Sequence, residues 1–339
     1  MYIRSAAAVS PQASFEALFT GAAGYQGEQL SCIEPDYTSY IDPKLIRRMS
    51  RIIKMGTAAA VESLKAAGLE QPDAIITGTA YGCLADTDAF LSRLVEFKEE
   101  LLSPTAFIQS THNTVAGQIA LLLKCHRHNN TFVHKGFSFE SALLEARTMM
   151  GENEITTALV GGVDEIIPAS HALLRRFGLY RANGNSLRLV DEPAKGTMAG
   201  EGAAFFVLDA QPSGDSLARL DAVQTWYKPA AANVVAEGIN ALLAEQGIEW
   251  KDIDLIVTGR NGDAGDDTLY DLFKKDIPET SFKQYCGEYP TATAFGLWLT
   301  SHILHQQRVP GVEGLKPRRI LLYNHYQQTH HAAYLLSAC

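Results

Sequence analysis

The sequence predicts an α/β fold made of two similar halves. Short apolar runs rich in β-branched residues alternate with segments whose apolar residues recur at helical spacing, which is the pattern of an α/β fold. This order occurs once before residue 210 and again after it, and the polar stretch 211–215 separates the two occurrences. A chain of 339 residues, of which 46% are hydrophobic, is long enough to give both halves a core. We therefore expect halves at residues 1–210 and 211–339.

In the first half, β-branched and apolar runs predict strands, and apolar stripes at helical spacing predict helices. The expected strands are 2–9, 74–77, 131–134, 155–160 and 205–208, and the expected helices are 43–67, 86–101, 114–124 and a segment from residue 141 onward. Residues 11–41 are expected to be irregular. In the second half the expected strands are 217–227, 255–257, 320–323 and 333–337, and the expected helices are 231–246, 267–275 and 292–307.

Composition excludes several functional classes. A net charge of −9 argues against a general nucleic-acid-binding protein. The five cysteines are odd in number and form no Cys-x-x-Cys pair, which favours reduced thiols over disulfides or a metal site. No apolar run reaches 18 residues and the N-terminus lacks the features of a signal peptide, so we expect a soluble cytoplasmic protein. No cofactor or metal is expected.

One strand–turn–helix unit, residues 131–146, has the form on which enzymes mount a nucleophile. The start of a helix stabilises developing negative charge through its free N–H groups and its dipole. Here the turn carries Phe137, Ser138 and Phe139. Phe137 has no nucleophilic atom, and a serine needs a neighbouring base and an oxyanion site. A serine at a helix start is also a common N-cap, which is the simpler interpretation of Ser138.

Six motifs, in order, resemble those of the β-ketoacyl synthase branch of the thiolase superfamily. They are Gly78-Thr-Ala-Tyr-Gly82, the segments 110–118 and 158–164, Met198-Ala-Gly-Glu-Gly-Ala203, the segment 283–288, and Asn324-His-Tyr326. The resemblance covers nearly the whole chain, and the Gly-Glu-Gly-Ala signature is its most specific part. It implies a thiolase-like fold, with two α/β halves stacked in a five-layered αβαβα arrangement, and a dimer.

The residues that such enzymes use for condensation are replaced here. The resemblance places the family's catalytic cysteine at Phe137 or Ser138, and its first histidine within residues 258–263, which contain Asn261 but no histidine. Its second histidine falls on Glu288, whose carboxylate would repel an enolate. Of the family's polar set only Lys283 remains. We interpret the site as inactive for condensation.

Chain-length factors are members of the same family that have lost the nucleophile and pair with an active synthase, whose product tunnel they help to shape. Aryl polyene, flexirubin-type and aromatic polyketide pathways use such pairs. The resemblance therefore implies an active synthase as partner, or a second copy of this chain. Phe137 and Phe139 would be bulky fillers beside the pocket, near Asn261 and one of His330 and His331, which point in opposite directions if they lie in a strand.

Acyl carrier protein is the second partner that the resemblance implies. The basic cluster Lys44, Arg47, Arg48 and Arg51 would dock this acidic protein, although a charge run is more often a solvated face. Two other functions stay open. One is a divergent acyltransferase or condensing enzyme that uses Ser138 as nucleophile, with Glu288 or His330/His331 as base. The other is an acyl-binding homodimer without a synthase partner.

Overall fold

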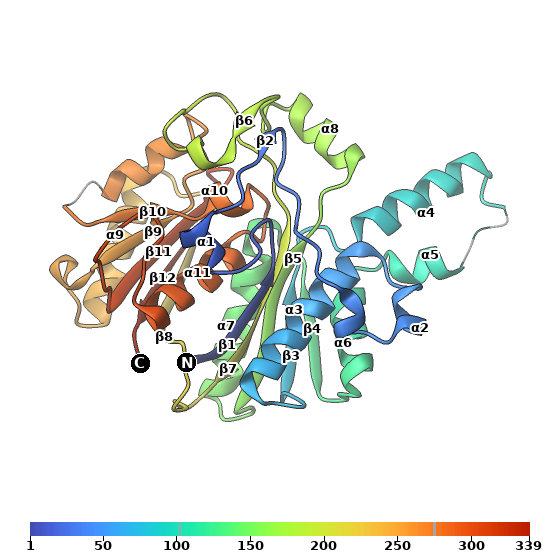
Figure 1. Cartoon of the computed structure of the whole chain (residues 1–339), viewed down its shortest axis with the longest axis horizontal. Helices are drawn as coiled ribbons and strands as arrows, with labels where there is room; N and C mark the ends of the chain where they lie inside the picture. The colour runs from blue at the N-terminus through green and yellow to red at the C-terminus, as the bar shows by residue number, and fades with distance from the viewer. Residues whose placement is uncertain (101, 103, 274–275) are drawn as a thin grey trace.

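The computed structural model describes every residue of the chain except 101, 103 and 274–275 (Figure 1). The first half contains β1 (Tyr2–Val9), α1 (Ala17–Thr20), β2 (Gln26–Gly27), α2 (Pro43–Ile46), α3 (Arg51–Ala67), β3 (Ala74–Gly78), α4 (Leu84–Glu96), α5 (Pro104–Gln109), α6 (Thr114–Leu123), β4 (His128–Phe132), α7 (Ser138–Gly151), β5 (Thr157–Asp164), α8 (Pro168–Arg176), β6 (Gly184–Asn185) and β7 (Gly202–Asp209). The second contains β8 (Ala218–Tyr227), α9 (Ala232–Glu245), β9 (Leu255–Thr258), β10 (Glu279–Ser281), α10 (Lys283–Cys286), α11 (Thr293–Gln306), β11 (Arg319–Tyr326) and β12 (His330–Ser337). Short 3₁₀ turns include η2 (Lys135–Phe137) and η5 (Asp267–Phe273).

The two halves repeat one topology. The short strands β2 and β6 pair only with each other and are left out of this comparison. The other strands lie in the orders β1-β7-β5-β3-β4 and β8-β12-β11-β9-β10. In each order the first of the five strands lies beside the fifth, followed by the fourth, second and third. In both halves the first two of these pairings are antiparallel and the last two are parallel. A short β1–β8 pairing, Tyr2 with Arg219 and Ile3 with Ala218, joins the halves into one hydrogen-bonded sheet.

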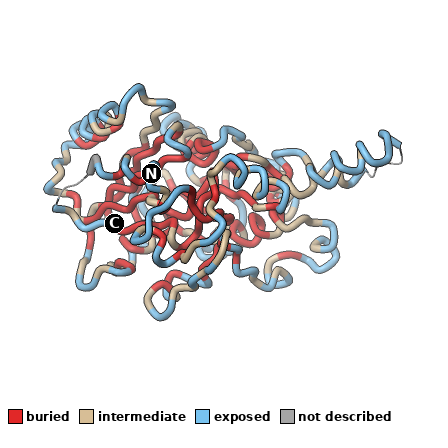
Figure 2. The backbone as a smooth tube through the Cα atoms, turned by 90° about the horizontal axis from the view of Figure 1, so that it is seen from above, coloured by how far each residue is buried: buried red, intermediate tan, exposed pale blue. Residues whose placement is uncertain are grey.

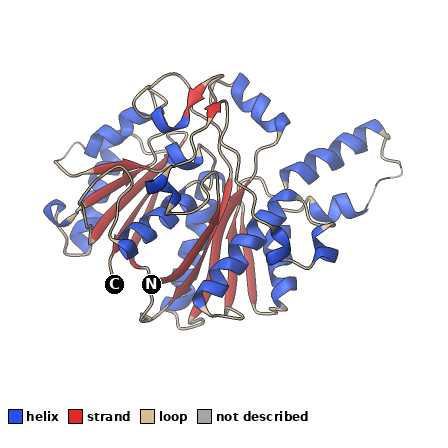
Figure 3. Ribbon diagram, in the orientation of Figure 1, coloured by secondary structure: helices blue, strands red, loops and turns tan. Residues whose placement is uncertain are grey.

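The helices complete five layers, which Figure 3 shows as blue helices between and outside the red strands. Helix α11 contacts strands of both halves, and α7 lies beside it against β3 and β5. Helix α3 covers the outer face of the first half, and α9 covers that of the second. The expected five-layered α/β fold is confirmed. The expected division at residues 210/211 falls in the connection between β7 and β8, and the assignment of residues 1–210 and 211–339 as the two halves stays a prediction.

Burial explains why the central layer holds the molecule together. Helix α11 is buried on all sides, from Thr293 to Leu304 with the exception of His302. Figure 2 shows this buried centre in red, with α4 and α5 projecting from the body. No helix in the described part of the chain is both long enough and apolar enough to cross a membrane.

Several element boundaries differ from expectation. The helix expected over 43–67 is two helices, because like charges crowd its beginning and Ser50 takes an extended conformation before α3. The strand expected over 131–134 lies at 128–132, where it pairs with β3. The helix expected over 86–101 ends at Glu96, and Leu101 lies outside the described residues. The segment 267–275 is a 3₁₀ turn to Phe273, and residues 274–275 are not described.

Candidate functional site

The turn before α7 packs closely against the end of β3 on one side and against β11 and β12 on the other. On one side, a Cβ added to Gly78 at the end of β3 would lie 2.4 Å from the carbonyl carbon of Ser138. On the other, a Cβ added to Gly136 would lie 2.8 Å from the Cβ of Tyr326 and 2.9 Å from that of His330. Both distances are shorter than side-chain contacts allow, so neither glycine position has room for a side chain. The turn is therefore closed to a nucleophile at residue 136.

The Ser138 hydroxyl is fully used inside the turn. Its Oγ donates to the Lys135 carbonyl oxygen at 2.8 Å and accepts from the His134 N–H at 2.8 Å. The expectation that Ser138 caps α7 is wrong, because Phe137 occupies the N-cap position and the serine is already helical. In the described residues, no histidine or carboxylate is hydrogen-bonded to this hydroxyl. A serine whose proton is held by a carbonyl lacks the base that activates a nucleophile.

Phe137 fills the space on the far side of this turn. Its ring contacts the His330 ring edge to face, with centroids 4.7 Å apart, and the rings of His134 and Tyr227 lie at 5.7 and 6.2 Å. Burial lowers the pKa of His330 to about 4, so the imidazole is neutral near pH 7. Phe139 lies deeper, fully buried against Phe206, and forms core rather than the wall of a described cavity.

Three of the residues expected at the site form one buried polar cluster. Oε2 of Glu288 accepts from Nζ of Lys283 at 2.7 Å and from Nδ2 of Asn261 at 2.7 Å. Lys283 Nζ also donates to the His325 carbonyl oxygen at 3.1 Å. Burial raises the pKa of Glu288, and the Lys283 charge opposes this rise. Oε1 of Glu288 is buried without a hydrogen-bond partner among the described residues.

The Gly-Glu-Gly-Ala signature holds this cluster in place. A Cβ added to Gly200 would lie 2.0 Å from the Cys286 carbonyl oxygen, so only glycine allows the two segments to touch. Across this contact the Gly200 N–H donates to the Glu288 carbonyl at 3.0 Å, and the Glu288 N–H donates to the Met198 carbonyl at 2.9 Å. The backbone of Glu288 is therefore fixed on both sides.

The two expected histidines lie on opposite faces of β12, as the strand period predicts. His330 faces Phe137. The Nδ1 of His331 lies 2.8 Å from the Tyr323 hydroxyl and its Nε2 lies 2.9 Å from the Gln328 carbonyl, so this ring is a structural group away from the turn. Of the two, only His330 faces the turn before α7, whereas the His331 ring lies 5.4 Å from that of His325.

His325 is a site residue that the sequence did not single out. Its ring is fully buried, stacks on Tyr270 with centroids 4.8 Å apart, and places Nε2 3.1 Å from the Asp266 carbonyl. Burial and the nearby Lys283 charge hold the pKa of His325 well below its usual value. The signal in the sequence is a histidine between Asn324 and Tyr326, just after the strand expected over 320–323, and only the tertiary contact with Lys283 gives it meaning.

The site has little free space. A cavity of about 20 Å³ lies beside Glu288, between Tyr326 and Tyr180, which is room for about one water molecule. Tyr180 also borders an apolar groove of about 240 Å³ under α8, lined by Leu173, Leu174 and Phe177 among others. The arrangement can hold one ion pair and line an apolar groove, and it offers no activated nucleophile.

The basic cluster expected to dock a carrier protein divides into two parts. Lys44, Arg47 and Arg48 lie exposed in and just after α2. Arg51 is half-buried and forms ion pairs with Glu34 and with Glu201, whose oxygens lie 2.5 and 2.6 Å from its guanidinium. Arg51 therefore fixes the Gly-Glu-Gly segment, whereas Lys44, Arg47 and Arg48 form no ion pair with any residue that the structure describes.

Comparisons with known proteins agree with this architecture. The family model described as "Beta-ketoacyl synthase, N-terminal domain" matches residues 9–212. The structure is similar to the ishigamide ketosynthase/chain length factor, with a TM-score of 0.83 and 18% identity, over 100% of this chain and 98% of that one.

Two further solved structures show the same fold. A β-ketoacyl synthase from Burkholderia phymatum has a TM-score of 0.80 and 15% identity, over 100% of this chain and 99% of that one. A chain of the ketosynthase ApeO in complex with its chain length factor ApeC, from Xenorhabdus doucetiae, has a TM-score of 0.74 and 16% identity, over 100% of this chain and 98% of that one. A sequence comparison with curated proteins gives no significant match.

Proposed function

We propose that this chain, which belongs to the β-ketoacyl synthase family, is a non-catalytic, chain-length-factor-like partner of an active synthase. One observation carries the proposal: at the positions where the resemblance expects the family's histidines, Asn261 and Glu288 are hydrogen-bonded to each other, and Lys283 also donates to Glu288 in the same buried cluster. A carboxylate there repels an enolate, whereas condensation needs that charge to be stabilised. The turn before α7 supplies no activated nucleophile to compensate.

An exposed apolar arm supports a protein partner. Helices α4 and α5 project from the body, as Figures 1 and 2 show. They expose large apolar side chains, which are Leu91, Val95, Phe97, Phe107 and Ile108, at 49–76% of their full surface. Several large apolar side chains exposed on one projecting arm favour an interaction site there. The partner is an active synthase subunit; pairing with a second copy of this chain is the alternative.

The groove under α8 supports a role in shaping an acyl tunnel. Its lining is mostly apolar, and it borders Tyr180, which also borders the small cavity at Glu288. A growing acyl chain is an apolar ligand, so an apolar groove of about 240 Å³ would hold only a limited length of it. The product class we propose is a fatty-acid or polyketide chain of aryl polyene type, made in the cytoplasm, where the free cysteines would stay reduced.

Acyl carrier protein is the second proposed partner. The exposed cations Lys44, Arg47 and Arg48 form a basic surface on a chain whose net charge is −9. Such a surface steers an acidic protein toward one face. Among the solved structures of this fold is a type II polyketide synthase acyl carrier protein in complex with its ketosynthase, matched at 16% identity and a TM-score of 0.78, over 100% of this chain and 99% of that one.

Intact-mass spectrometry tests the proposal. The purified chain is incubated with acyl-loaded carrier protein, alone and with a co-expressed synthase that has an intact cysteine and two histidines. We expect no acyl adduct on this chain, and loading on the synthase when the two co-purify. The matched control is Ser138→Ala, which should behave like the unmodified chain. An adduct on this chain that disappears in Ser138→Ala would overturn the proposal and identify an enzyme.

A further inference from the structure

A cleft opens at the opposite end of the second half from the candidate site. Strand β11 begins at Arg319 and ends at Tyr326, next to the turn before α7. At about 3.3 Å per residue, its eight residues separate the two ends by about 25 Å. The cleft therefore cannot belong to the catalytic pocket of the family, and the inference drawn from it is independent of the function proposed above.

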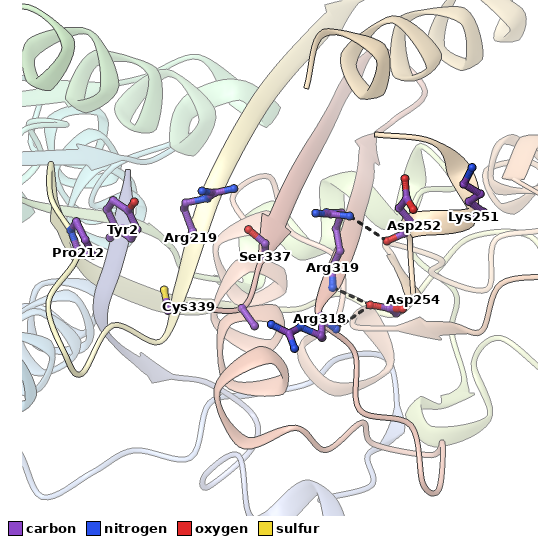
Figure 4. A pocket seen from close by; sticks show the side chains of 11 residues that line it. Tyr2, Pro212, Arg219, Lys251, Asp252, Asp254, Arg318, Arg319, Ser337 and Cys339 are labelled. Atoms are coloured by element: carbon purple, nitrogen blue, oxygen red, sulfur yellow. Dashed lines mark hydrogen bonds between the residues drawn. The ribbon is translucent and has the colours of Figure 1, made fainter. Parts of the chain in front are cut away.

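The strand register places two arginines in this cleft on the same face of the sheet, with one strand between them. Arg319 on β11 pairs with Ser337 on β12, and Ser337 pairs with Arg219 on β8. Residues paired across neighbouring strands project from the same face of the sheet. Figure 4 shows Arg219 and Arg319 on either side of Ser337, facing the same space. The cleft has a volume of about 680 Å³, and Lys251 and Arg318 line it as well.

The carboxylates in the cleft do not neutralise Arg318 and Arg319, at the start of β11. Oδ2 of Asp254 accepts from the backbone N–H groups of Arg318 and Arg319, at 2.8 and 2.9 Å. Oδ2 of Asp252 accepts from the Glu249 N–H at 2.9 Å. Across the described residues, neither Arg318 nor Arg319 forms an ion pair with a carboxylate.

Arg319 is left with unused donors. Its Nη1 reaches only a backbone oxygen, that of Asp252 at 3.5 Å, and its Nε is buried with no hydrogen-bond partner among the described residues. A buried N–H of a charged group without an acceptor is costly, so an acceptor in the cleft would stabilise the fold. Arg219 is more engaged: its Nε forms an ion pair with Asp221, and the side chain is also hydrogen-bonded to Tyr2.

We propose that this cleft binds a small phosphate-bearing molecule, seated between Arg319 and Arg219 with Arg318 nearby. The guanidinium fork matches the oxygens of a phosphate, and Arg319 and Arg318 bring to this space two positive charges that no carboxylate of the described residues pairs. The volume accommodates a ligand of nucleotide size. Tyr2 and Pro212 form the wall on the Arg219 side in Figure 4, and they offer an apolar surface to the organic part of the ligand.

Calorimetric titration of the full chain with inorganic pyrophosphate, at constant ionic strength, tests this site. We expect saturable binding at one site, a dissociation constant at least tenfold higher in Arg319→Gln, and a smaller increase in Arg318→Gln, whose side chain makes no hydrogen bond in the described structure. Arg188→Gln is the matched control, because its exposed guanidinium pairs with Glu192 elsewhere on the surface. It should bind as the unmodified chain does.

A second measurement locates the ligand. Cys339 lines the cleft and is the exposed cysteine, whereas Cys32, Cys83, Cys125 and Cys286 are buried. Pyrophosphate should slow alkylation of Cys339 in the unmodified chain and leave the rate unchanged in Arg319→Gln. The proposal is overturned if no saturable binding is seen, if Arg188→Gln weakens binding as much as Arg319→Gln, or if pyrophosphate does not protect Cys339.

Discussion

At the scale of single residues, the buried Lys283–Glu288 pair is the most consequential contact in the candidate site. Removing the lysine in Lys283→Met leaves a buried carboxylate without its counter-charge, which we expect to lower the free energy of unfolding by about 3–5 kcal/mol. Urea unfolding at pH 7 measures it. The double variant Lys283→Met/Glu288→Gln should recover most of the loss, because the uncharged amide introduced by the second substitution keeps an acceptor oxygen for Asn261.

The pH dependence of Lys283→Met has a definite sign. Lys283 lowers the pKa of Glu288, so its removal raises that pKa further above the unfolded value. A carboxyl whose pKa is higher in the folded state destabilises the fold as it ionises, so the deficit should grow as the pH rises and shrink as it falls. Lys251→Met is the control, since its exposed pair with Glu249 contributes little. Equal losses in both variants would contradict this account.

The sequence identified the residues of this cluster but not their bonding. Asn261, Lys283 and Glu288 were found because they stand at positions where related motifs carry polar groups. That Asn261 and Lys283 share one oxygen of Glu288 depends on packing between separate segments, which no local pattern encodes. Ser138 was misplaced for a local reason: Lys135 takes a positive φ of 48°, and the 3₁₀ turn that begins at this residue moves the N-cap to Phe137.

At the scale of elements, strands with continuous apolar runs were predictable and short polar ones were not. The strands β3, β7 and β9 are buried along their length, and their apolar runs predicted them from the sequence. Strand β10 has only three residues, Glu279–Ser281, and exists because it pairs with β9. The break between α2 and α3 was missed because the apolar stripe continues across it, while the charges on the other face oppose a continuous helix.

The arm formed by α4 and α5 yields a prediction at this scale. Phe107 and Ile108 on α5 are 58% and 63% exposed, so a polar replacement should cost the isolated chain little stability. If the arm binds the partner synthase, Phe107→Asp and Ile108→Asp should each weaken the complex by about 2 kcal/mol, as loss of a central interface residue does. Light scattering of the co-purified pair, with unfolding curves of the chain alone, measures both effects.

The control for the arm is Val234→Asp. Val234 lies on α9, at the outer face of the second half, and is 37% exposed. This substitution introduces the same charge on a different layer and should leave the complex intact. A complex that is unaffected by either arm variant would show that the partner binds elsewhere.

At the scale of the whole molecule, the sequence could reveal the repeated strand–helix order but not which distant segments meet at the candidate site. Strand–helix order occurring twice along the chain predicted two halves, and the strand orders bear this out. The candidate site joins both halves: the turn before α7 comes from the first, and Asn261, Lys283, Glu288 and His330 from the second. Segments far apart in the sequence meet there because the central helices hold the ends of β3 and β11 together.

The charge distribution of the whole chain gives the last prediction. Replacing Lys44, Arg47 and Arg48 by glutamate reverses the exposed basic surface on a chain that is already acidic. If this surface receives an acidic acyl carrier protein, the association rate should fall roughly tenfold or more at low salt, and the difference should shrink as salt screens the charges. Stopped-flow mixing with labelled carrier protein, over a range of salt concentrations, measures the rate.

The control for this prediction keeps the net charge change and moves its position. Replacing the exposed Arg147, Arg188 and Lys316 by glutamate changes the total charge equally at distant sites. If general repulsion governs association, both triple variants slow it to the same extent, and the basic surface has no docking role. If only the first variant associates slowly, the steering charge lies at and just after α2. Arg51 stays bonded to Glu201 in both triple variants, so the difference cannot arise from disruption of the Gly-Glu-Gly segment.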